Sequence, residues 1–228
     1  MSRRRPSPAG PARPVAPRLT ATSRDRRIAS LASGLLAQGF ALDPSPGWER
    51  LAASWLAELA VWNARMDLTA ARDDDELVDL MLADAWVLAS RILPAARVVD
   101  VGTGAGAPGL ALSILRADAP VTMVEPLQKR ASFLRARVGM LVDRPLELLP
   151  VRGETLPDRG WDVAISRATL TPPAWLALGV RLAASTWVLL ARDAPPEVRG
   201  ATLVEDLPYT WPLTGSVRRA CRYVTAAS

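Results

Sequence analysis

The sequence predicts an α/β fold: a mostly parallel, twisted sheet with helices on both faces and a helical cap on its N-terminal side. A short apolar run, Val98–Val101, leads into a glycine-rich loop and then a helix, which is the strand–loop–helix junction of an open α/β sheet. After it, short β-branched runs alternate with helical segments, as in a parallel sheet. Before it, apolar residues recur at helical spacing.

We expect three parts: a basic Pro/Arg-rich tail (1–22), a helical cap (23–93) and an α/β domain (94–228). The 228-residue length suits one domain with appendages. Eight arginines and one acid give the first 27 residues a charge of +7, which leaves −2 for the rest of the chain, so the net charge of +5 comes from the N-terminal segment. Its composition predicts disorder. A nonspecific RNA-binding arm, an organellar transit peptide and an inert extension stay open, and we favour a solvated tail with weak RNA contact.

The cap is predicted to hold three helices. The first covers residues 23–40, where apolar residues recur at helical spacing. For the second, Ser45 is the expected N-cap with Pro46 in the first turn, and its tryptophans are interpreted as core. The third begins at an Asp73 cap and runs to Ile92.

The glycine loop satisfies two templates. The spacing Gly104-x-Gly106-x-x-Gly109, followed by Glu125, is the dinucleotide fingerprint. The run D-V-G-T-G-A-G from Asp100 resembles motif I of S-adenosylmethionine-dependent methyltransferases. An acid just before the glycines would repel a pyrophosphate but suits a ligand that carries an ammonium and a sulfonium, so Asp100 favours the methyl donor.

Strands are expected at residues 121–125, 146–151, 161–165 and 185–191 of the α/β domain. Two further segments, 201–205 and 218–225, are expected to pair as a hairpin at the edge of the sheet. A loop with Pro208, Pro212 and Gly215 separates them. Ser166-Arg167-Ala168 follows the fourth strand, at the edge where catalytic and substrate groups gather in such sheets.

Some chemistries are excluded by residue types that the chain lacks. It has no histidine and one cysteine, Cys221, so we expect no metal site, no imidazole base and no internal disulfide. No apolar run is long enough to span a bilayer. We therefore expect a cytoplasmic protein without a membrane partner.

Four ordered blocks resemble the RsmG (GidB) family. They are residues 62–73 (W-N-x-x-x-D-L-T-x-x-R-D), 100–109 (D-V-G-T-G-A-G-A-P-G), 127–134 (L-x-K-R-x-x-F-L) and 165–168 (I-S-R-A). The family consists of methyltransferases that act on N7 of a guanine in small-subunit ribosomal RNA. The resemblance implies a Rossmann-like class I methyltransferase fold, S-adenosyl-L-methionine as cofactor, and ribosomal RNA or a ribosomal particle as partner. We expect the protein to be a monomer.

The resemblance also implies site residues. Glu125 would hold the ribose hydroxyls, Gly153 and Glu154 would meet the adenine end through their backbone, and Arg167 would lie between donor and substrate as the catalytic residue. The full donor set is Asp100, Gly102, Gly104, Gly106, Ala107, Glu125, Gly153, Glu154 and Arg167. The residues expected on the RNA side are Asn63, Thr69, Lys129, Arg130 and Ser166.

The sequence departs from the family pattern at several positions. Leu80 and Met81 stand where the family has an Arg-His pair, Asp67 replaces an asparagine, and Arg192 loosely matches a lysine. We expect these departures on the RNA side rather than in the donor pocket. A divergent paralogue with another RNA substrate, or a noncatalytic RNA-binding or assembly protein, therefore stays open, and an NAD-binding oxidoreductase is a less favoured alternative.

The residue types suit methylation of guanine N7. N7 carries a lone pair and no proton, so its methylation requires no general base and no cysteine nucleophile. Alignment of N7 with the methyl carbon is the main requirement. N7 must stay free, so we expect Arg167 to contact O6 or a phosphate.

Overall fold

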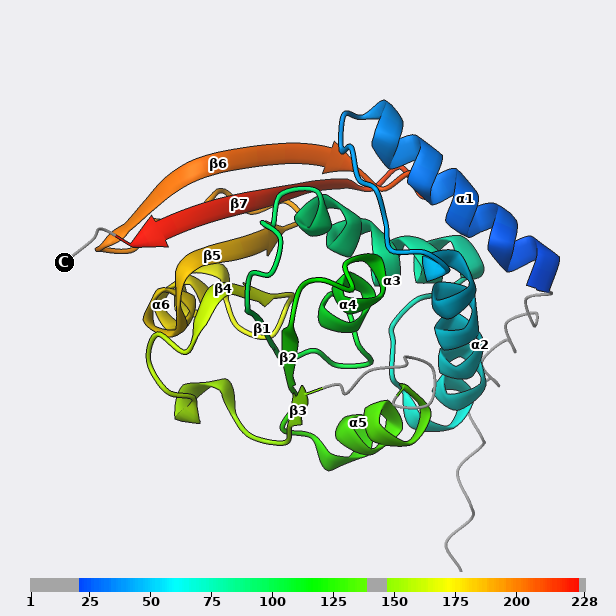
Figure 1. The fold of residues 1–228 in the computed structure, drawn as a ribbon, viewed down its shortest axis with the longest axis horizontal. Coiled ribbons are helices and arrows are strands. Elements are labelled where there is room, and N and C mark those ends of the chain that lie inside the picture. The colour runs from blue at the N-terminus through cyan, green and yellow to red at the C-terminus, as the bar shows by residue number, and fades with distance from the viewer. Residues whose placement is uncertain (1–20, 139–146, 226–228) are drawn as a thin grey trace, which may run out of the picture.

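A seven-stranded sheet with the strand order β3-β2-β1-β4-β5-β7-β6 forms the centre of the molecule (Figure 1). The computed structural model describes residues 21–138 and 147–225. β1 to β5 pair in parallel, and β7 runs antiparallel between β5 and β6, which confirms the predicted mostly parallel sheet. The strands are β1 (Val98–Val101), β2 (Val121–Val124), β3 (Glu147–Leu149), β4 (Trp161–Ser166), β5 (Ala183–Leu190), β6 (Ala201–Thr210) and β7 (Val217–Thr225).

Helices cover both faces of this sheet, as the sequence predicts. Val98 and Ile165 belong to one core, which they share with α1 to α4, whereas Val99 and Ala164 belong to a second core with α6. Neighbouring residues of a strand enter opposite cores because their side chains alternate. The α-helices are α1 (Ala21–Ala37), α2 (Trp48–Met66), α3 (Asp74–Ala89), α4 (Gly109–Leu115), α5 (Gln128–Phe133) and α6 (Pro172–Leu182).

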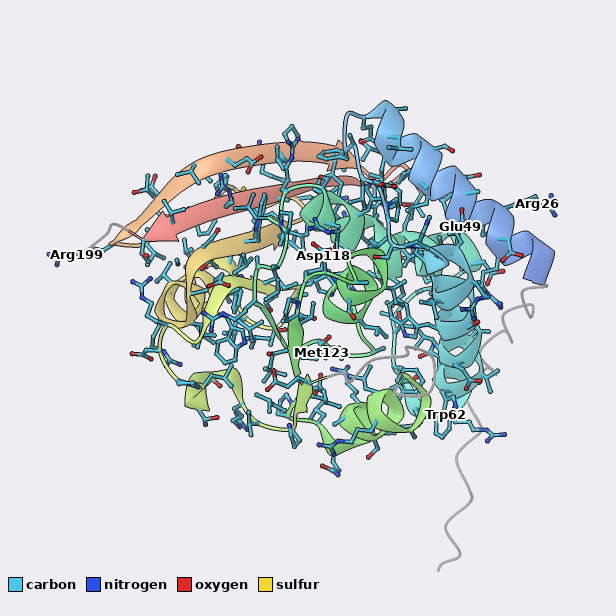
Figure 2. The ribbon with its side chains drawn as sticks, in the orientation of Figure 1. Arg26, Glu49, Trp62, Asp118, Met123 and Arg199 are labelled. Atoms are coloured by element: carbon cyan, nitrogen blue, oxygen red, sulfur yellow. The ribbon has the colours of Figure 1, made fainter. Side chains whose placement is uncertain are left out.

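Two short helical turns complete the described elements. α5 continues as a π-helical turn, η1 (Leu134–Val138), and a 3₁₀ turn, η2 (Gly153–Thr155), follows β3. Trp62 lies at the end of α2, and its ring centroid is 6.2 Å from that of Phe133 in α5 (Figure 2). The first core therefore extends from the cap to α5.

The start of α2 differs from the prediction. Gly47, in a left-handed conformation with φ of 77°, is the N-cap, and α2 begins at Trp48. Ser45 instead accepts a hydrogen bond at its Oγ from the Ala117 N–H (2.8 Å), so it holds the chain that leaves α4. The Asp73 cap is confirmed, because its Oδ1 accepts from the Glu76 N–H at 2.8 Å.

The closing strands are longer than predicted. β6 continues to Thr210 and includes Pro208, which was expected in a loop. Because β6 is the edge strand of the sheet, a proline there need not remove a ladder hydrogen bond. The residues that connect β6 to β7 are therefore only 211–216.

Residues 1–20 of the predicted tail lie outside the described residues. α1 already begins at Ala21, two residues before the expected start of the cap. Over residues 21–138 and 147–225, we find no helix whose length and apolar character would let it cross a membrane. The cap and the α/β domain share the first core, in which Trp55 of α2 and Leu110 of α4 are both fully buried.

Trp55 connects the cap directly to the glycine loop. Its Nε1 donates to the Ala105 carbonyl at 3.2 Å. Gly106 has φ of +115°, and a Cβ on it would lie 3.1 Å from Cζ2 of Trp55 and 2.9 Å from Cδ2 of Leu110. The loop therefore requires glycine at this position both for its conformation and for the space beneath the tryptophan.

We predict that Trp55→Phe lowers the free energy of unfolding by about 1 kcal/mol more than Trp48→Phe. Both changes trim a buried indole of α2, but only Trp55 has a hydrogen bond to the loop. Urea denaturation of the two variants measures the difference. Equal losses would mean that this hydrogen bond does not stabilise the fold.

Candidate functional site

Two adjoining cavities lie at the carboxyl edge of the parallel strands. The first, about 470 Å³, is lined by the glycine loop, the segment after β2, the segment after β4 and the cap residues 68–70. The second, about 350 Å³, lies beyond the end of β4 and is bordered by β5 and by residues of the C-terminal hairpin, which consists of β6, β7 and the connecting residues 211–216. Leu80, Arg167 and Ala168 line both cavities. This is the edge at which open α/β sheets bind ligands.

The glycine loop contributes Gly102, Gly104 and Ala107 to the first cavity. Gly102 has φ of +76°, and a Cβ there would lie 2.1 Å from Oγ1 of Thr169. Only glycine both adopts this positive φ readily and leaves room for the Thr169 side chain. The close approach brings the segment after β4 against the loop, so the two walls of the cavity are fixed relative to each other.

Glu125 lies after β2 and is 2% exposed on the wall of the first cavity. Its Oε2 accepts from the Gly104 N–H at 3.0 Å, and its Oε1 accepts from the Leu127 N–H at 2.8 Å. A carboxylate has room for about four hydrogen bonds. Glu125 therefore holds the loop and keeps capacity to accept from a ligand.

Asp100 is fully buried and does not line either cavity. Its Oδ2 accepts from the Gly109 N–H at 2.8 Å, which ties the end of β1 to the start of α4. Burial raises the pKa of the Asp100 carboxyl to about 6, against the opposing effect of the Gly109 hydrogen bond. The structure thus places this acid behind the loop and outside the lining of both cavities, and the direct contact with a donor that the sequence argument expects stays a prediction.

Arg167 lies between the two cavities, with an 18% exposed side chain. Its Nη1 donates to the Leu80 carbonyl and lies 3.3 Å from Oδ2 of Asp84. Ala168, the next residue, has a left-handed backbone with φ of 53°. Such a conformation in alanine is strained and is found preferentially at functional sites.

The structure brings some of the predicted RNA-side residues to the cavities. Thr69 and Arg130 line the first cavity, and Ser166 lines the second while its Oγ donates to the Val101 carbonyl at 2.7 Å. Asn63 accepts from the Thr69 N–H at 2.8 Å and so shapes the cap segment from outside the cavity. Lys129 is exposed on α5 and borders neither cavity.

Gly153 and Glu154 lie apart from both cavities. A Cβ on Gly153 would be 2.5 Å from Cγ1 of Val101, so this glycine permits close packing of η2 against β1. The carbonyl of Glu154 accepts from Nη2 of Arg181 at 3.0 Å. Their role at the adenine end of a donor stays a prediction.

The positions of Leu80 and Met81, which replace the Arg-His pair of the family, differ from the expectation that they lie on the RNA side. Both line the first cavity, next to the glycine loop, and Leu80 also lines the second. These two departures therefore border the glycine loop, and Leu80 lies between the two cavities, whereas the sequence places both away from the loop. The tertiary structure explains this position. Because α3 packs beside α4, one turn of α3 lies at the carboxyl edge of the parallel strands.

Sequence reasoning missed Asp84, Tyr209 and Trp211. All three line the second cavity, and they come from α3 and from the end of β6 and the residue after it. An aspartate in an apolar stretch of α3 was the available signal, because a buried acid requires partners. Among the described residues, no cluster of three or more histidine, cysteine or acidic residues could hold a metal.

We predict that Asp100→Asn becomes more stable relative to the wild type as the pH rises from about 4 to about 7, by about 2 kcal/mol. The folded-state pKa of about 6 lies above the unfolded value, so the native state binds the proton more tightly and loses stability as the carboxyl ionises. The amide oxygen of asparagine keeps the bond from Gly109. Denaturation of both proteins without ligand checks this, and a pH-independent difference would contradict it.

Comparison with known proteins identifies the family. Residues 49–177 match the family model GidB, described as rRNA small subunit methyltransferase G. The ribosomal RNA small subunit methyltransferase G of Anaeromyxobacter dehalogenans (strain 2CP-1) is 31% identical over 85% of this chain and 95% of its own length. The protein of the same description from Methylobacillus flagellatus is 36% identical over 71% of this chain and 80% of its own.

Among solved structures, a SAM dependent methyltransferase from Aquifex aeolicus matches with a TM-score of 0.49 and 18% identity, over 65% of this chain and 92% of that one. The assignment depends on the sequence matches alone. Since the family model covers more than half of the chain, and its relative from Anaeromyxobacter is matched over nearly its whole length, the chain belongs to the RsmG (GidB) family of small-subunit rRNA methyltransferases.

Proposed function

We propose that this protein transfers a methyl group from S-adenosylmethionine to N7 of a guanine in small-subunit ribosomal RNA. Membership of the RsmG family carries the proposal. The adjoining cavities on either side of Arg167 support it, because a transfer reaction requires two binding sites that meet at the reacting atoms. We further propose a cytoplasmic monomer that acts on a ribosomal particle or its RNA.

The first cavity suits the donor. Its glycines leave the space next to the loop free, and the remaining lone pairs of Glu125 suit hydroxyl groups of a ribose. When bound, S-adenosylmethionine supplies a methyl group on a positively charged sulfur. Asp100 contributes indirectly, because it holds the start of α4 under the loop.

The second cavity suits a base taken out of its stack. Trp175, Tyr209 and Trp211 give it aromatic walls, and Ser166 and Asp193 give it polar groups. N7 carries no proton, so its methylation requires no general base. Arg167 would orient the base by a bond to O6 or a phosphate, so that N7 faces the first cavity.

A noncatalytic RNA-binding protein is the second candidate. It is favoured by Leu80 and Met81, which place apolar side chains where the family has an Arg-His pair. An NAD-dependent oxidoreductase is a weaker alternative, supported only by the glycine spacing and Glu125.

We predict that S-adenosylhomocysteine at about 100 times its Kd raises the melting temperature by roughly 5–10 °C, whereas NAD leaves it unchanged. Glu125→Gln should weaken this binding about tenfold. The NH₂ group of the glutamine would face one of the two backbone N–H groups that donate to the carboxylate in the wild type, so that hydrogen bond would be lost. Glu197→Gln, an exposed control that borders neither cavity, should bind as the wild type does. A shift with NAD alone would favour the oxidoreductase.

We predict that Arg167→Ala lowers methyl transfer to small-subunit particles by about a hundredfold. The particles come from a strain that lacks this methyltransferase, and labelled S-adenosylmethionine reports the transfer. Arg97→Ala is the control, since Arg97 also pairs with an acid (Asp162, 3.1 Å) but at the opposite end of β4. Donor binding without transfer to RNA by the wild type would favour the noncatalytic alternative.

A further inference from the structure

We infer that Asp84 is the residue that positions Arg167 between the two cavities. The inference concerns how the site is built, and its kinetic consequence rests on the proposed function. Asp84 lies on α3 and is 2% exposed. Arg167 follows β4, so the two residues meet only in the folded protein.

The Asp84 carboxylate divides its hydrogen bonds between two sets of partners. Its Oδ1 accepts from the Tyr209 hydroxyl at 2.7 Å and from Nε1 of Trp211 at 2.9 Å. This leaves Oδ2 for Arg167, whose Nη1 is 3.3 Å away. The guanidinium of Arg218 lies over the Trp211 ring, 3.9 Å from its centroid, and so packs the outer side of the network. The carboxylate is therefore held from the hairpin before it meets the arginine.

Arg167 is anchored at one nitrogen. Its Nη1 bonds to the Leu80 carbonyl and faces Asp84, both on α3. Within the described part of the chain, its Nε and Nη2 make no hydrogen bond to the protein. An arginine carries five N–H donors in a rigid plane, so one anchored nitrogen sets the direction of the others. Those N–H groups are available to a base or a phosphate.

A contribution to stability does not account for this arrangement. A buried ion pair is a poor source of stability, because the desolvation of both charges opposes their attraction. Tyr209 and Trp211 could satisfy a neutral amide oxygen equally well. The negative charge of Asp84 is required only by Arg167, and this favours a positioning role.

α3 offers a matched control in Asp79. It is also fully buried, and it also holds the C-terminal hairpin: it accepts from the Thr214 N–H (2.8 Å), from Oγ1 of Thr214 (2.9 Å) and from the Leu213 N–H (3.1 Å). It has no arginine partner among the described residues. Asp79→Asn therefore perturbs the hairpin without releasing Arg167.

The kinetic experiment compares Asp84→Asn with Asp79→Asn in the methyl-transfer assay, with thermal denaturation of each. We expect Asp84→Asn to lower kcat about ten- to a hundredfold while the KM for S-adenosylmethionine changes little, because a misplaced group impairs alignment. Asp79→Asn should stay within about twofold in kcat, whatever its melting temperature. In an Arg167→Ala background, Asp84→Asn should cause no further loss.

The inference is overturned if the two asparagine variants lower kcat equally, or if the loss from Asp84→Asn adds in full to that of Arg167→Ala. A failure of the proposed function has a different signature, namely no transfer by the wild type. In that case arginine side-chain NMR decides. The Nε–H signal of Arg167, assigned by its loss in Arg167→Ala, should broaden or shift in Asp84→Asn and stay unchanged in Asp79→Asn. An unchanged signal in Asp84→Asn would refute the positioning role.

Discussion

The backbone of the glycine loop is held from three directions, and the rest of the site depends on this restraint. Trp55 donates to Ala105 from the cap, Glu125 accepts from Gly104 beside β2, and Asp100 accepts from Gly109 below. The loop residues have positive φ at Gly102, Gly104 and Gly106, so their own conformational preferences would not select this shape. Tertiary hydrogen bonds select it instead, and the loop is preorganised for a ligand.

The cap also helps to build both cavities. α3 carries two buried aspartates, Asp79 and Asp84, which together bind the residues that connect β6 to β7. One helix thereby joins the cap, the hairpin and the segment after β4. All three border the second cavity, and α3 also contributes Leu80 and Met81 to the first.

The position of Leu80 and Met81 gives the departures from the family pattern a physical meaning. Both line the first cavity, and the carbonyl of Leu80 also anchors Arg167. The backbone contact of Leu80 does not depend on its side chain. The anchor of Arg167 therefore survives the loss of a charged pair, while the cavity wall becomes more apolar than an Arg-His pair would make it.

The sequence by itself determined the sheet, the loop and the family, because strands, glycine turns and ordered motifs are local patterns: Val98–Val101, the Asp73 cap and residues 165–168 all lie where local chemistry places them. Tertiary structure alone decided which side chains face the ligand. Asp100 lies near the end of β1 and Glu125 directly follows β2, yet Asp100 is buried behind the loop and Glu125 lines the cavity. Asp84 and Tyr209, 125 residues apart, share a hydrogen bond that no local spacing predicts. These side-chain positions depend on how the helices pack across the sheet. That packing is determined jointly by residues that are distant in the sequence.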